Sequence, residues 1–145
     1  MTQSALSLED ARANISEWFA PWIQDMDLQV EAVEHGFARL RVPANEKLSR
    51  MGGIMCGQAM MALADTAMVF AAFSVLDQPR EIATVQQSTS FFRAVAGKDL
   101  ICEARISKSG RTMLFGDCTL YMDGQPEKPA GQATLVYAVG GPRQA

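Results

Sequence analysis

The chain has 145 residues, of which 48% are hydrophobic, which is enough to bury the core of one domain over residues 1–145. Its formal net charge of −3 argues against the basic surface that binds a nucleic-acid backbone, so we expect no nucleic-acid partner.

Metal binding and disulfide bonding are not expected of this chain. The cysteines Cys56, Cys102 and Cys118 show no C-x-x-C spacing, and the single histidine, His35, has no nearby partner and is expected in an exposed turn. Residues 1–14 carry two acids and no apolar run, unlike a secretory signal. We therefore expect a cytoplasmic protein with reduced thiols.

The N-terminal third predicts one helix and one hairpin. Apolar residues recur at helical spacing over residues 8–22, after the possible cap Ser7, which predicts a short amphipathic helix that Pro21 interrupts. Alternation over residues 28–32 and 37–42, around a turn at residues 34–36, predicts a β-hairpin. The polar residues 43–50 are expected to form a loop.

A long helix is predicted from Gly57 to about Leu76. From Met51 to Leu76 the only charged side chain is Asp65, and the stretch is long enough to span a bilayer. An aspartate at mid-span costs about 2.5 to 3.5 kcal/mol on insertion, however, and no cluster of Lys or Arg flanks the run. We therefore expect no membrane span but a helix buried inside a soluble domain.

The remaining chain predicts four strands. The helix is expected to end at Asp77-Gln78-Pro79, and runs rich in β-branched and aromatic residues follow at 82–92, 99–107, 111–122 and 130–139. The order of elements is a helix, two strands, a long helix and four strands. This order predicts an α+β fold in which an antiparallel sheet of about six strands carries its helices on one face.

Asp65 is the main candidate for chemistry. A carboxylate on an otherwise apolar helix needs hydrogen bonds or a charge partner, because unpaired burial of a charge is costly, and such groups are often functional. The residue type alone is equally compatible with a structural role. In that case Asp65 reaches solvent at one edge or accepts a hydrogen bond from a neighbouring hydroxyl such as Thr66.

The segment Gly53-Ile54-Met55-Cys56-Gly57-Gln58-Ala59, followed by Ala62-Leu63-Ala64-Asp65-Thr66-Ala67, carries a family resemblance. It resembles the hot-dog-fold acyl-CoA thioesterases of the phenylacetate-pathway (PaaI-like) type, whose signature is a G-x-x-H-G-G loop and an L-x-D-x-A helix. The resemblance covers nearly the whole chain and implies a sheet wrapped around one long helix. Three positions depart from the pattern, where the family has histidine, glycine and asparagine and this chain has Cys56, Gln58 and Arg50.

The resemblance implies roles for particular residues. Asp65 would act as general base toward water or as nucleophile on the thioester carbonyl, and the backbone N–H of Gly57 would stabilise the developing negative charge. Thr84 matches the position of a family hydroxyl that positions water, with Gln86 and Gln87 as polar substitutes. The alternative for Thr84 is an ordinary strand former.

The implied substrate is an acyl-CoA with an aryl or medium-chain acyl group. Its phosphates would meet basic side chains at the rim of the pocket, although each of these could equally be a surface charge: Arg93, Lys98, Lys108 and Arg111. Arg50, Cys56 and Gln58 would border the substrate. For Cys56 a reactive thiol and a small buried apolar residue are both open. Trp18 and Trp22 are expected as packing anchors, or alternatively as a lid over the acyl channel.

The resemblance also implies self-association. Residues 82–92 form an apolar edge strand that needs a partner, and hot-dog proteins form two-fold dimers through this strand. We expect at least a homodimer, with a homotetramer as the alternative, in which Asp65 of one chain faces Thr84 of the other. No cofactor is required. The alternative function is a non-catalytic acyl-CoA binding or sensing protein, which the changes at Arg50, Cys56 and Gln58 favour, and a dehydratase is a distant third because its catalytic histidine is absent.

Overall fold

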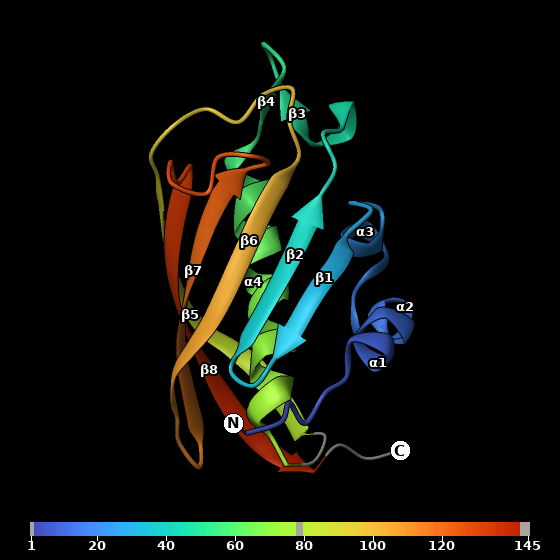
Figure 1. Ribbon diagram of the computed structural model, residues 1–145, viewed down its shortest axis with the longest axis vertical. Coiled ribbons are helices and arrows are strands. Elements are labelled where there is room, and N and C mark those ends of the chain that lie inside the picture. The colour runs from blue at the N-terminus through green and yellow to red at the C-terminus, as the bar shows by residue number, and fades with distance from the viewer. Residues whose placement is uncertain (1, 78–79, 143–145) are drawn as a thin grey trace.

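An antiparallel sheet curves around one long helix in the computed structural model, which describes residues 2–77 and 80–142 (Figure 1). The six strands run in the order β1-β2-β6-β7-β8-β5. Their bounds are Gln29–Glu34 for β1, Phe37–Val42 for β2, Leu100–Ser109 for β6, Met113–Met122 for β7, Gly131–Pro142 for β8 and Arg80–Phe91 for β5. The central helix α4 spans Gly57–Val75. The predicted α+β class and hot-dog arrangement are confirmed.

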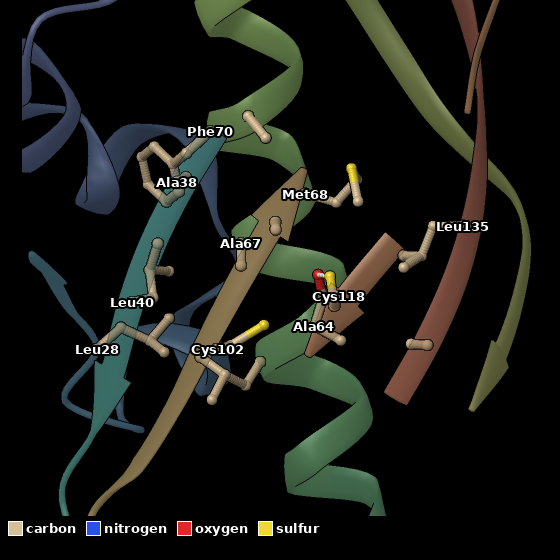
Figure 2. Packing of buried hydrophobic residues seen from close by; sticks show 14 of the residues in the cluster. Leu28, Ala38, Leu40, Ala64, Ala67, Met68, Phe70, Cys102, Cys118 and Leu135 are labelled. Atoms are coloured by element: carbon tan, nitrogen blue, oxygen red, sulfur yellow. Dashed lines mark hydrogen bonds between the residues drawn. The ribbon is translucent and has the colours of Figure 1, made fainter. Parts of the chain in front are cut away.

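Small residues allow α4 to lie close to the sheet. Its alanines at 59, 64, 67, 71 and 72 are all at most 3% exposed, and Figure 2 shows two of them beside side chains from the neighbouring strands. The sheet also has a small residue at this contact, Gly116 on β7. A Cβ there would lie 2.6 Å from the Sδ of Met68 and 2.7 Å from the carbonyl oxygen of Arg105. The helix and the sheet therefore pack so closely that Gly116 has no room for one additional methyl group.

The apolar composition of α4 follows from its place in the core. By length and composition alone Gly57–Val75 could cross a membrane, with a mean hydropathy of 1.4. Within the fold, however, 67% of that apolar window is buried. A helix covered by protein on most sides needs apolar residues around most of its circumference.

The N-terminal segment differs from the single predicted helix. It forms three short helices beside β1, α1 at Leu8–Ala13, α2 at Ile15–Trp18 and α3 at Pro21–Gln24 (Figure 1). Ser7 caps α1 as predicted, since its hydroxyl accepts the N–H of Asp10 at 3.1 Å. Asn14 departs from helical geometry, with φ −105° and ψ 5°, and Pro21 starts a new helix because it has no N–H to donate.

The predicted loop before α4 contains additional structure. A 3-10 turn at Glu46–Leu48 leads into a small antiparallel pair, β3 at Ser49–Arg50 and β4 at Ile54–Met55. The β1–β2 hairpin is confirmed and His35 is exposed in its turn. Strand β5 begins two residues earlier than predicted, and residues 78–79 of the predicted helix end lie outside the described residues.

Candidate active site

One face of α4 is left uncovered by the sheet. Gln58, Met61, Ala62, Asp65 and Val69 follow the i, i+3, i+4, i+7 and i+11 spacing of a helical stripe, and they are the least buried side chains between Gln58 and Val69. A groove of about 380 Å³ runs along this stripe. Its other walls are side chains of the N-terminal segment and β5, namely Phe19, Trp22, Ile23 and Gln87.

Two hydroxyls fix the carboxylate of Asp65 in this groove. The Oγ1 of Thr84 donates to Oδ1 of Asp65 at 2.8 Å. The hydroxyl oxygen of Tyr137 lies 2.5 Å from the same Oδ1 and 2.5 Å from the backbone oxygen of Asp65. Among residues 2–77 and 80–142, no donor reaches Oδ2. One carboxylate oxygen is therefore held in place and the other has no protein partner.

Tyr137 acts in this arrangement as a protonated donor. Its side chain is only 2% exposed. Burial, followed by the negative charge of Asp65, raises the pKa of Tyr137 far above its ordinary value of 10.0. The phenol therefore keeps its proton and can donate to Asp65 throughout the physiological pH range.

The sheet register explains why Thr84 and Tyr137 meet Asp65. Thr84 on β5 is the direct cross-strand partner of Tyr137 on β8, so both side chains point toward α4. A bulge at Val85 then shifts the register. Because of this extra residue, Gln87 also faces the helix, and its Nε2 donates to the backbone oxygen of Met61 at 3.1 Å.

The same bulge removes Gln86 from the site. Gln86 pairs with Val136, whose neighbours Leu135 and Tyr137 face the core. Successive strand residues point to opposite faces, so Gln86 lies on the outer face of the sheet. The prediction that Gln86 substitutes for a polar group beside Asp65 is wrong for this reason.

The N-terminus of α4 forms a second hollow, also of about 380 Å³. Cys56 is the N-cap, and its backbone oxygen accepts the N–H groups of Ala59 and Met60. Within the described part of the chain the N–H of Gly57 has no acceptor, as is usual in the first turn of a helix. A Cβ at Gly57 would lie 3.3 Å from the ring of Phe91, which lines the same hollow.

The structure does not bring Gly57 and Asp65 together within one chain. They are eight residues apart on one helix, which separates their backbones by about 12 Å along its axis. They also line different hollows. A carbonyl in contact with the Asp65 carboxylate therefore cannot accept the Gly57 N–H of the same chain.

The prediction that Asp65 faces Thr84 of another chain is wrong, because the two are hydrogen-bonded within one chain.

Four of the five predicted basic residues fall into two pairs. Arg50 and Arg93 are exposed and line the hollow at Gly57, where the Nε of Arg93 donates to the backbone oxygen of Pro129 at 3.0 Å. Lys108 and Arg111 are exposed near the β6–β7 turn, and Arg111 lines a recess at the C-terminal end of α4. The structure thus places the first pair near Gly57 and the second pair away from it.

Three further predicted residues occupy distinct positions. Gln58 is exposed on the open face of α4 and lines the Asp65 groove. Cys56 is half-buried against the core. Thr66 does not serve Asp65, because its hydroxyl donates to the backbone oxygen of Ala62 at 2.7 Å. The structural alternative that paired Asp65 with Thr66 is therefore wrong.

Sequence reasoning missed Tyr137. The signal was present, since residues at 131, 133, 135, 137 and 139 alternate inward and Tyr137 is the only one of them with a polar side-chain group. A buried phenol needs a hydrogen-bond partner, and Asp65 is the carboxylate on the helix opposite. The described residues contain no group of three His, Cys, Asp or Glu side chains able to hold a metal ion.

An antiparallel sheet wrapped around one long helix is the arrangement of the hot-dog class of proteins. The sequence profile described as Thioesterase superfamily matches residues 52–128, which is more than half of the chain. The chain belongs to the Thioesterase superfamily.

Individual proteins are similar to this chain in sequence or in fold. The solved structure of a protein from Silicibacter sp. TM1040 described as a "putative thioesterase" is 29% identical, with a TM-score of 0.85 over 96% of this chain and 95% of that one. The PaaI protein from the phenylacetic acid degradation operon of E. coli shares the fold at 18% identity, with a TM-score of 0.80 over 92% of this chain and 93% of that one. A "putative esterase" of Saccharolobus solfataricus is 28% identical over 65% of this chain. The match covers 62% of the length of that relative.

Proposed function

We propose that the protein is an acyl-CoA thioesterase in which Asp65 performs the chemistry. The observation that carries the proposal is the Asp65 carboxylate, which two hydroxyls hold at Oδ1 while Oδ2 has no protein donor within the described residues. It lies in a groove wide enough for a ligand. Membership of the Thioesterase superfamily supports hydrolysis of a thioester in particular.

The reaction can follow either of two routes. As a general base, Oδ2 takes a proton from water while the water oxygen attacks the carbonyl carbon, the C–S bond then breaks, and the departing thiolate takes up the proton. As a nucleophile, the carboxylate itself attacks, expels the thiolate and forms an anhydride that water hydrolyses. Both routes give a free acid and a thiol, and both require the ionised carboxylate of Asp65.

We further propose that the oxyanion donor is the backbone N–H of Gly57 of the partner subunit. The separation of about 12 Å along α4 argues against a donor from the same chain. Strand β5 is an edge of the sheet and leaves Val85 57% and Phe91 49% exposed, as expected of a strand that pairs with a second copy. A homodimer through β5 would place the N-terminus of one α4 near the groove of the other chain.

The CoA moiety is assigned to the hollow at the N-terminus of α4. Arg50 and Arg93 supply two cations there, which suits phosphate groups. The groove at Asp65 offers no cation among its lining residues. The charged and apolar ends of an acyl-CoA thus match two different hollows that a dimer would join.

The direct test is thiol release from acetyl-, decanoyl- and phenylacetyl-CoA. Asp65→Asn keeps the shape of the side chain and removes the base, so we expect a loss of at least about 10²-fold in kcat. Asp117→Asn is the matched control. Asp117 is also half-buried, and on the outer face of β7 it accepts a hydrogen bond from the hydroxyl of Ser107 at 3.2 Å. Equal rates for wild type and Asp65→Asn would contradict the proposal. Saturable binding without turnover would instead favour the non-catalytic acyl-CoA binding protein.

A separate experiment tests the shared site. Gly57→Pro removes the proposed donor at the first helical position, where proline is tolerated, and Cys56 before it already has the extended geometry that proline requires, with φ −70° and ψ 150°. Gly57→Ala retains the N–H and is the control. Co-expression of inactive Gly57→Pro with inactive Asp65→Asn should restore about a quarter of wild-type activity, because half of the dimers would contain one intact site of two. No restoration would refute sharing between subunits.

A further inference from the structure

Trp22 is exposed to an unusual degree for a large aromatic residue in an ordered helix. Its side chain is 60% exposed, whereas its neighbour Ile23 is 9% exposed and belongs to the core. Helix α3 is also held by Gln24, whose Nε2 donates to the backbone oxygens of Phe19 at 2.8 Å and Ser16 at 3.1 Å. The backbone around Trp22 is therefore anchored while the indole ring remains in contact with solvent.

The other tryptophan shows what a packing anchor looks like in this fold. The ring centroid of Trp18 lies 4.9 Å from that of Phe73 and 5.9 Å from that of Phe70. Trp18 thereby matches the predicted packing role, and Trp22 does not. The ring of Trp22 instead forms one wall of the groove that contains Asp65.

The side chains that line the groove favour an apolar ligand. Apolar side chains dominate its walls, with Phe19 and Trp22 on one side and Met61 and Val69 on the other, and Asp65 is the only charged residue among those that line it. Phosphates are disfavoured beside a carboxylate that has no cation next to it. A hydrocarbon chain or an aromatic ring instead gains binding free energy by covering exposed apolar surface. The volume of about 380 Å³ is at the small end of ligand sites, which suits one acyl group rather than a whole acyl-CoA.

We propose that the acyl group of the substrate lies between α3 and α4 against the ring of Trp22, and that Trp22 sets a preference for aryl and medium-chain acyl groups over acetyl. This inference rests on the proposed thioesterase function. A large acyl group covers the indole ring on binding, whereas an acetyl group, whose carbonyl carbon lies beside the Asp65 carboxylate for attack, extends into the groove by a single methyl group. Trp22 is thus a specificity-determining residue with no part in the proton transfers.

The kinetic test compares acyl groups of different size. Trp22→Ala should lower kcat/KM for decanoyl-CoA and phenylacetyl-CoA by about tenfold, mainly through KM, and leave acetyl-CoA within about twofold. Trp22→Phe should retain most of the preference, since it keeps an aromatic wall. Phe115→Ala is the matched control, because Phe115 is another exposed aromatic residue, 39% accessible, outside the groove. An equal loss for all three substrates, or none, would overturn the inference.

A binding measurement separates this inference from the proposed function. The chain has two tryptophans, so Trp18→Phe leaves Trp22 as the sole indole reporter. In the Trp18→Phe, Asp65→Asn double variant, decanoyl-CoA should shift the emission of Trp22 to the blue, and free CoA should not. This shift in a protein whose wild type releases no thiol would refute the thioesterase and keep the acyl site. Hydrolysis of decanoyl-CoA by the wild type without any shift in the double variant would refute the acyl site alone.

Discussion

The hydroxyl of Tyr137 offers the sharpest test of how the Asp65 carboxylate is held. Tyr137→Phe removes one oxygen atom and preserves the packing of the ring. In the wild type that oxygen lies 2.5 Å from both Oδ1 and the backbone oxygen of Asp65. After the substitution Thr84 is the remaining donor to Oδ1 within the described chain. We therefore expect a small loss of stability together with a loss of turnover.

The magnitude follows from the number and type of bonds removed. A single hydroxyl proton serves both acceptors, so the loss counts as one hydrogen bond to a charged group, which contributes about 1.5 to 3 kcal/mol. Asp65 is half-buried and can recover part of this from water, which favours the lower end of the range. We expect the free energy of unfolding to fall by about 1.5 kcal/mol at pH 7, or about 5 °C in Tm.

The pH dependence has a definite sign. The folded state holds the proton of Tyr137 far more tightly than the unfolded state, whose tyrosine titrates near pH 10. The stabilisation is thus fully present below pH 10 and is lost above it. At pH 11 deprotonation favours the unfolded wild type by about 1.4 kcal/mol, whereas Tyr137→Phe has no such proton to lose. The difference in stability between the two proteins should therefore nearly vanish at pH 11.

Urea denaturation followed by far-ultraviolet circular dichroism at pH 7 and pH 11 measures both quantities. For turnover, Tyr121→Phe is the control, since Tyr121 is the other tyrosine of the chain and donates to Glu103 at 3.0 Å on the outer face of the sheet. We expect Tyr137→Phe to lower kcat by about tenfold, because Asp65 is held less firmly, and Tyr121→Phe to leave it unchanged. Equal stability of wild type and Tyr137→Phe at pH 7, or a difference that persists at pH 11, would show that the Tyr137 hydroxyl does not stabilise the fold through Asp65.

Two further predictions concern the support of α4. Gly116→Ala should cost about 1 to 3 kcal/mol of unfolding free energy, because its Cβ would meet the backbone oxygen of Arg105 at 2.7 Å, whereas Gly141→Ala, with no atom within 4 Å of its Cβ, should be neutral in the same denaturation assay. Ser74→Ala should cost about 1 to 3 kcal/mol, because the fully buried hydroxyl of Ser74 accepts the N–H of Gly36 at 2.8 Å. Faster amide exchange at Gly36 would report that loss, and unchanged exchange would contradict it.

Local patterns were sufficient to predict the main elements and the central residue of the site. The apolar run around Asp65 predicted α4, and alternation predicted the strands, because burial on one or all sides leaves a period in the sequence. Asp65 was identifiable because a lone charge in such a run needs a partner. The N-terminal helices were less predictable, since single residues such as Asn14 and Pro21 interrupt an otherwise helical period.

The amino-acid pattern alone indicates that this chain packs one long helix against a sheet and that Asp65 is the one charged residue on that helix. The contacts within the folded chain show which face of α4 stays open, that Tyr137 is hydrogen-bonded to an acid 72 positions away, and that the bulge at Val85 turns Gln86 outward. This difference arises because helical and strand periods come from residues that are neighbours along the chain. Register, bulges and uncovered faces are instead set by contacts between residues far apart in the sequence, which the local pattern does not contain.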